Sequence, residues 1–142
     1  MSHLLDTNVL SETRKKQPDP GVLTWLSKVR ASELFVSVLS IGEIRYGIER
    51  LARRDAVQAE ALGRWLDQLT AAYGDRIVPV TMEIAHEWAR LSVPDRLPVV
   101  DGLLAATALV NGWTLVTRNT ADVESTGVRL LNPFSTAQVS KR

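Results

Sequence analysis

Residues 3–10 read HLLDTNVL: a short, mostly apolar run is followed directly by an acid, a hydroxyl and an amide, and then apolar residues resume. This order predicts a buried strand that ends in a turn and continues into a helix. Asp6, Thr7 or Asn8 can cap that helix, because each side chain can accept from the free backbone amides there. Whether Asp6 does more depends on which other acids the fold brings beside it.

The rest of the chain alternates between segments of strand character and segments of helix character. Ser40 is expected to cap the third helix, and Gly74 is in the position of a left-handed C-cap for the fourth. The alternation predicts an α/β fold with a central parallel sheet of four to five strands flanked by helices, because parallel neighbours need crossover connections. The expected strands are residues 3–5, 33–39, 76–80, 114–117 and 128–131, and the expected helices are 9–16, 20–29, 40–53, 62–73, 84–91 and a helix from 99 or 101 to 111.

Length and composition are those of an ordinary globular domain. The 142 residues, 45% of them apolar, predict one domain over 1–134 with a C-terminal tail at 135–142. No apolar run approaches the ~18 residues of a membrane span, and the start does not resemble a secretion signal. The absence of cysteine fits a reducing cytoplasm and leaves only oxygen or histidine ligands for a metal.

Charge and known motifs exclude several functions. The net charge of +1 does not by itself indicate a nucleic-acid-binding protein, and the basic runs 14–16, 50–54 and 141–142 are interpreted as solvated surface. No Gly-x-Gly fingerprint or P-loop is present. A phosphotransferase of the Asp-x-Asp type would need a second acid where this chain has Asn8, an amide that cannot carry out acid-base chemistry.

Three acids are placed where a parallel sheet forms sites, outside the carboxyl ends of its strands. Asp6 follows the first strand, Glu43 follows the second, and Asp101 begins the apolar helix VVDGLLAATAL. Each acid also has a structural explanation. Glu43 is three residues beyond Ser40 and fits a capping box, and Asp101 interacts favourably with a helix dipole.

Together the three acids favour a metal site. Two carboxylates in close contact repel by roughly 4 kcal/mol at an effective dielectric of about 20, and a divalent cation relieves that repulsion. Oxygen ligands suit Mg²⁺ or Mn²⁺, which can activate water for the hydrolysis of a phosphodiester. The residues expected to orient ligands and water or to bind substrate are Thr7, Asn8, Ser37 and Thr117, with Asn119 also placed to act, and Arg45 or Arg118 is expected to bind the scissile phosphate.

Four ordered blocks carry a family resemblance: LLDTNVLSE, VSVLSIGEIRYGIE, VVDGLLAATAL and LVTRNTADVESTGVRLLNPF. They resemble the signature blocks of PIN-domain proteins, and most closely the VapC/FitB-like ribonuclease toxins of bacterial type II toxin-antitoxin pairs. The resemblance covers residues 3–134. It implies a three-layer PIN-like fold, a cytoplasmic Mg²⁺- or Mn²⁺-dependent endoribonuclease acting on single-stranded RNA, a small inhibitory antitoxin, a homodimer, and binding of promoter DNA only through the antitoxin.

The resemblance also implies residue roles. The family's three primary acids fall on Asp6, Glu43 and Asp101, as catalytic residues and metal ligands. Many PIN domains carry a fourth acid where this chain has Asn119, and the next acid is Asp122. Either Asn119 acts through its amide oxygen or through water, or Asp122 reaches back to the metal.

Two functions from different classes follow. The first is a metal-dependent ribonuclease toxin. The second is a catalytically weak PIN-fold binding partner that acts mainly within a DNA-binding antitoxin-repressor complex. Retention of all three primary acids favours the first.

Overall fold

Five short strands form a parallel sheet in the computed structural model, which describes residues 1–135. The strand order is β3-β2-β1-β4-β5, so β1 is central and β2 and β4 are its neighbours. The predicted parallel α/β sheet is confirmed. Residues 136–142 of the expected tail, which include Lys141 and Arg142, lie outside the described residues. The strands are β1 (His3–Leu5), β2 (Leu34–Ser37), β3 (Ile77–Val78), β4 (Thr114–Val116) and β5 (Leu130–Leu131).

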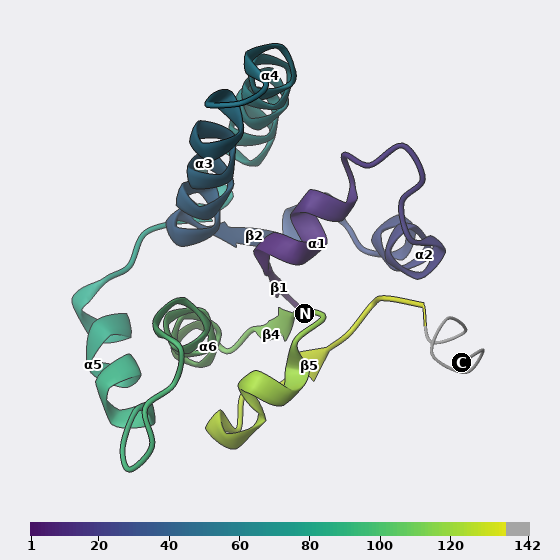
Figure 1. Cartoon of the computed structure of the whole chain (residues 1–142). Coiled ribbons are helices and arrows are strands. Elements are labelled where there is room, and N and C mark those ends of the chain that lie inside the picture. The colour runs from purple at the N-terminus through teal and green to yellow at the C-terminus, as the bar shows by residue number, and fades with distance from the viewer. Residues whose placement is uncertain (136–142) are drawn as a thin grey trace, which may run out of the picture.

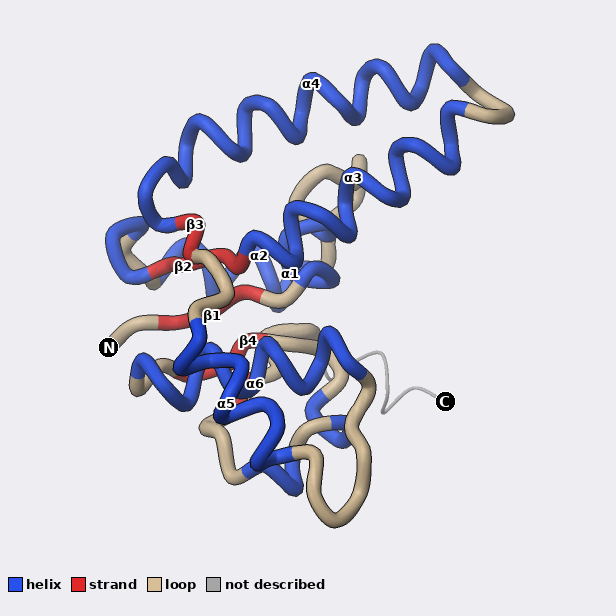
Figure 2. The backbone as a smooth tube through the Cα atoms, turned by 90° about the vertical axis from the view of Figure 1, so that its left-hand side faces the viewer, coloured by secondary structure: helices blue, strands red, loops and turns tan. Residues whose placement is uncertain are grey.

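Helices cover both faces of the sheet and complete the expected three layers. Figure 2 shows the strands between the pair α3 and α4 on one side and the pair α5 and α6 on the other. Helices α1 and α2 lie on the same face as α3 and α4 (Figure 1). The helices are α1 (Thr7–Glu12), α2 (Pro20–Lys28), α3 (Val38–Ala52), α4 (Ala56–Tyr73), α5 (Met82–Leu91) and α6 (Val99–Asn111), with short 3₁₀ turns at Ala31–Glu33, Gly74–Arg76, Thr120–Asp122 and Glu124–Thr126.

The sheet separates two hydrophobic cores because successive side chains of a strand point to opposite faces. Leu5 packs with the helices α1 to α4, whereas its neighbour Leu4 packs with α6. The central strand is therefore apolar on both faces, as expected of a buried parallel strand. The same division holds on the neighbouring strands, where Val36 and Val116 belong to the first core and Phe35 and Leu115 to the second.

The expected helix starts are only partly confirmed. Asp19 caps α2 by accepting from the amide of Val22 at 3.2 Å, with Pro20 in the first helical position as predicted. The expected cap at Ser40 is wrong. The cap of α3 is Ser37, whose hydroxyl accepts from the amide of Leu39 at 3.0 Å, so the strand ends earlier than its β-branched sequence suggests. Ser40 is buried inside the helix.

Other expected boundaries shift by a few residues. The first helix ends at Glu12, whose buried carboxylate accepts from the amide of Asp19, and this contact turns the chain before residue 16. The third strand, expected over 76–80, is Ile77–Val78, and the fifth, expected over 128–131, is Leu130–Leu131. Each pairs with only the last two residues of its neighbouring strand, because β2 ends at Ser37 and β4 ends at Val116. Gly74 has the positive φ that favours glycine, 53°, but its ψ of −123° is outside the left-handed helical region, so the expected left-handed cap is wrong.

The segment after β5 is tied closely to the start of α2. Asp19 accepts from the amide of Ser135 at 2.8 Å, and Phe134 is buried. Gly21 makes this approach possible, because a Cβ there would be 2.5 Å from the carbonyl oxygen of Pro133 and 2.7 Å from the amide nitrogen of Ser135. The contacts are with backbone atoms, which cannot move aside as a flexible side chain can.

Gly21→Ala is therefore expected to lower the free energy of unfolding by about 1–3 kcal/mol, the usual cost of overpacking. Urea denaturation measures this change. The matched control is Gly63→Ala in the middle of α4, where the nearest atom is 3.9 Å away; it should raise stability by about 0.5–1 kcal/mol. Equal effects of the two substitutions would show that the close approach at Gly21 is unimportant.

Candidate functional site

One cavity brings together acids from three separate helix starts at the carboxyl edge of the sheet. It has a volume of about 300 Å³. Asp6 reaches it from the end of β1, Glu43 from α3, and Asp101 from the first turn of α6. We call it the acid cavity. It is lined by Asp6, Thr7, Asn8, Glu43, Asp101 and Asn119.

Asp6 is the most firmly held of the three acids. It caps α1, and its Oδ1 accepts from the amide of Thr7 at 2.6 Å. Its Oδ2 accepts from the hydroxyl of Thr117 at 2.8 Å, and its backbone amide donates to the carbonyl of Val116 at 2.9 Å. The side chain, only 7% exposed, is thus fixed by its own helix and by the neighbouring strand β4. The helix-cap interpretation of Asp6 is confirmed, and the cap also holds the carboxylate at the cavity.

Thr117 connects the ends of β1 and β4. It is 1% exposed, and besides donating to Asp6 it accepts from the amide of Asn119 at 3.0 Å and from the side-chain amide of Asn8 at 3.4 Å. Asn8 in turn accepts from the amide of Arg118 at 3.3 Å. The two strand ends therefore hold each other through polar side chains, which fixes one wall of the acid cavity.

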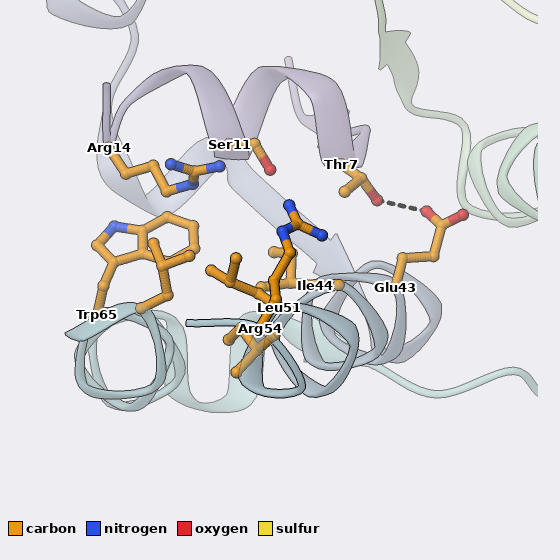
Figure 3. Close-up of a pocket in the computed structure, with 11 residues that line it drawn as sticks. Thr7, Ser11, Arg14, Glu43, Ile44, Leu51, Arg54 and Trp65 are labelled. Atoms are coloured by element: carbon orange, nitrogen blue, oxygen red, sulfur yellow. Dashed lines mark hydrogen bonds between the residues drawn. The ribbon is translucent and has the colours of Figure 1, made fainter. Parts of the chain in front are cut away.

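Glu43 lies in the second turn of α3, with its side chain toward α1. The hydroxyl of Thr7 donates to its Oε1 at 2.5 Å, as Figure 3 shows. The expected capping box between Ser40 and Glu43 is wrong, because α3 begins at Val38 and its cap is Ser37. Glu43 therefore does not take part in a capping box at the start of its own helix. Its side chain lines the acid cavity.

Burial and the repulsion from neighbouring carboxylates both disfavour the charged forms of Asp6 and Asp101. Burial raises the pKa of Asp6, the bonds from Thr117 and the Thr7 amide partly oppose this, and Glu43 raises it further. The pKa of Asp101 is raised by burial first and then by the negative charges of Asp6, Asp122 and Glu43. A perturbed group in a cavity is a common mark of a functional site.

The donors suit a hard divalent cation, although they do not form a complete coordination shell as they lie. Within residues 1–135, no three His, Asp or Glu side chains are close enough together to hold a metal ion jointly. The acid cavity nevertheless offers three carboxylates, two side-chain amides and a hydroxyl and no sulfur or imidazole, which is the ligand chemistry of Mg²⁺ and Mn²⁺. The convergence of these three carboxylates on one cavity is the structural observation that favours a cation there.

The two alternatives for a fourth ligand occupy different places. Asn119 follows β4 and lines the acid cavity. Asp122 ends the next 3₁₀ turn and does not line the cavity, but it is near enough for its charge to raise the pKa of Asp101. By position Asn119 is the better placed of the two.

The remaining residues expected at the site lie around it or away from it. Ser37 is buried as the cap of α3 and positions that helix without lining the acid cavity. Arg45 is ion-paired with Glu49 at 3.8 Å and lines the groove between α3 and α4. The guanidinium of Arg118 is 3.8 Å from the ring centre of Phe134. Neither arginine lines the acid cavity.

A second pocket of about 290 Å³ adjoins the acid cavity and shares Thr7 and Glu43 with it. It lies between α1, α3 and α4, and Arg14 and Arg54 extend into it (Figure 3). The sequence does not predict this pocket. Both arginines belong to basic runs that are interpreted first as solvated surface, although Arg14, Lys15, Lys16 and Arg45 are also candidates to steer RNA. Only the packing of the α3–α4 pair against α1 brings them together.

No helix within the described 1–135 has the length and apolar content that crossing a membrane requires.

Comparisons with known proteins agree with this architecture. The PIN domain family model matches residues 3–124. The VapC ribonuclease Y4jK of Sinorhizobium fredii is 30% identical over 94% of this chain and 99% of its own, and the toxin FitB of Neisseria gonorrhoeae is 28% identical over 92% and 97%. The solved structure of FitAB bound to an IR36 DNA fragment has a TM-score of 0.85 and 27% identity, covering 94% of this chain and 96% of that one.

Repulsion in the acid cavity predicts that Asp101→Asn stabilises the metal-free protein at neutral pH. The pKa of Asp101 is raised on folding, so its contribution to stability is complete below the ordinary aspartate pKa and is lost as the pH rises through the raised pKa. Asparagine does not ionise, and the variant lacks that loss.

Urea unfolding in EDTA between about pH 4 and about pH 8 measures the difference. The stability of the variant relative to the parent chain should increase with pH. Asp67→Asn, at an exposed position on α4, is the control and should change stability by less than about 0.5 kcal/mol. An advantage of Asp101→Asn that is the same at every pH would contradict this account of the cavity.

Proposed function

The chain belongs to the PIN domain family, and from this we propose that it is a metal-dependent endoribonuclease, the toxin of a type II toxin-antitoxin pair. The observation that carries the proposal is the convergence of Asp6, Glu43 and Asp101 on one cavity from three different elements. The relative named as a VapC ribonuclease supports the reaction class, and the relative named as the toxin FitB supports the role of a toxin.

We propose that Asp6, Glu43 and Asp101 hold Mg²⁺ or Mn²⁺, with Asn119 as the fourth residue of the site and Asp122 as the alternative. When bound, the ion lowers the pKa of a bound water and offsets negative charge that develops on the phosphodiester. Its charge would also favour the ionised forms of Asp6 and Asp101, whose pKa values are raised first by burial and then by neighbouring carboxylates. A bound cation would therefore support catalysis and also stabilise the ionised acids in the folded protein.

The surrounding residues act by holding the acids in place. Thr117 and the amide of Thr7 hold both carboxylate oxygens of Asp6, and the hydroxyl of Thr7 holds Glu43. Asn8 is joined to Thr117 and to the backbone of Arg118, so it keeps the ends of β1 and β4 together. Groups that orient metal ligands are commonly worth 10- to 100-fold in activity or metal affinity.

The partners follow from the same reading. We propose that a small cognate antitoxin inhibits this chain and that the chain forms a homodimer. We also propose that it is cytoplasmic and that RNA is its substrate. The similar FitAB structure was solved with DNA, whereas this chain has a net charge of only +1. We therefore propose that promoter DNA is bound through the antitoxin rather than by this chain directly.

Asp101→Asn is expected to reduce cleavage of single-stranded RNA in Mg²⁺ by at least about a hundredfold, since loss of a ligand should exceed loss of an orienting group. EDTA should abolish cleavage by the parent chain, and added Mg²⁺ or Mn²⁺ should restore it. Incubation with total RNA and mapping of the new ends measures both effects, with Asp67→Asn as the control of unchanged activity.

Two results would overturn the proposal. A folded Asp101→Asn variant with full EDTA-sensitive activity would remove the acid cavity from catalysis. A parent chain that binds its antitoxin but cuts no RNA in either metal would instead favour the catalytically weak binding partner.

A further inference from the structure

The pocket beside the acid cavity is the strongest feature that the catalytic site leaves unexplained. We call it the basic pocket. Figure 3 shows Thr7 and Glu43 at one end, Trp65 and Arg14 at the other, and Arg54 between them. Its apolar floor is formed by Ile44, Ile48, Leu51, Leu62 and Trp65, and the remaining lining residues are Ser11 and Gly47.

The two arginines of the basic pocket differ from the other arginines of the α3–α4 pair. Arg45 and Arg64 form ion pairs with Glu49 and Glu60. No ion pair or hydrogen bond joins the guanidinium of Arg14 or Arg54 to another group of residues 1–135, and both side chains are exposed. Two like charges that extend into one pocket from separate turns repel each other unless an anion lies between them.

The pocket also offers apolar surface for bases. Trp65 is half-buried, and its indole forms one end of the floor. Sites for single-stranded nucleic acid combine cationic groups along the backbone with apolar and aromatic side chains against the bases. The basic pocket has both components, and it continues directly from Thr7 and Glu43 of the acid cavity.

We propose that the basic pocket binds the single-stranded RNA immediately beside the scissile phosphodiester. Arg14 and Arg54 bind backbone phosphates there, and Trp65 contacts a base. This inference rests on the proposed ribonuclease function and assigns the phosphate-binding role to arginines other than Arg45 and Arg118. It also resolves an electrostatic difficulty, because a polyanion must approach a cavity lined by three carboxylates, and two guanidinium groups at its border favour that approach.

The charge of the pocket favours RNA over a protein segment as its occupant. An apolar peptide would fill the floor but leave both guanidinium groups without partners. Only a peptide with acidic side chains matches them, and such a peptide is the competing occupant that the experiment must separate from RNA.

The test uses Asp101→Asn as the parent, which should bind RNA without cutting it. A fluorescent oligouridylate of about 12 nucleotides, within the usual span of single-strand sites, is titrated in Mg²⁺ and followed by anisotropy at several salt concentrations. Adding Arg14→Gln and Arg54→Gln together should weaken binding at least about tenfold and reduce the slope of log affinity against log salt by about 1.4, since each phosphate contact contributes about 0.7.

The matched control is Lys16→Gln with Arg53→Gln, which removes two exposed positive charges from the same two turns without touching the pocket. It should change binding less than threefold, or about 0.65 kcal/mol. All four positions are exposed, so unchanged melting temperatures should show that each variant is folded. Equal losses in the two pairs, or no loss in either, would overturn the proposal.

Two further arms separate this inference from the proposed function. If the chain with Asp101 intact cuts RNA, and the Arg14→Gln and Arg54→Gln variant cuts it equally well, the basic pocket is not the RNA path although the enzyme assignment stands. If the chain with Asp101 intact cuts nothing, the proposed function itself fails. An oligoglutamate peptide whose binding depends on the two arginines while oligouridylate binding does not would identify an acidic peptide as the occupant and overturn the proposal.

Discussion

Like-charge repulsion among carboxylates at one edge of the sheet is the constraint on which the rest of the site depends. Asp6, Glu43 and Asp101 reach the acid cavity from separate elements, and burial together with neighbouring charge raises the pKa values of Asp6 and Asp101. The fold tolerates this in part because hydrogen bonds hold two of the acids, Asp6 and Glu43, in place. The amide of Thr7 and the hydroxyl of Thr117 hold Asp6 in a position that an isolated buried carboxylate would not keep.

The two pockets beside each other extend the same electrostatic principle. In our proposal the acid cavity binds a small cation, and the adjoining basic pocket binds a polyanion through Arg14 and Arg54. Thr7 and Glu43 line both pockets, so the acidic and the basic groups lie in directly adjoining pockets. A phosphodiester held across that boundary would meet the cation on one side and the guanidinium groups on the other. Such charge arrangements orient a substrate as well as attract it.

Much of this architecture could be predicted from the chain alone, and the failures have physical causes. The alternation of strand-like and helix-like segments predicts the sheet. Asp6 is recognisable because it directly follows a strand, and Asp101 is recognisable because it begins an apolar helix. The expected cap at Ser40 is wrong because the apolar, β-branched sequence of 33–39 predicts a strand throughout, whereas the hydroxyl of Ser37 accepts from the amide of Leu39 and the helix begins at Val38. The proposed role of Arg54 in binding RNA could not be predicted from the sequence around it, because the basic pocket forms only when α1 packs across the α3–α4 pair. The ion pair of Arg45 with Glu49 follows the i,i+4 spacing of a helix, whereas the contact of Arg118 with Phe134 depends on how the segment after β5 packs.

The central claim is that the three acids form a single cation site, and it can be observed directly. Crystals of the protein grown with Mn²⁺ and measured near the manganese absorption edge would locate the ion by its anomalous scattering. The account predicts a peak in contact with Asp6 and Asp101 and within reach of a rotated Glu43, and no such peak in Asp101→Asn crystals. A peak elsewhere, or an acid cavity without manganese at concentrations that saturate the protein in solution, would contradict it.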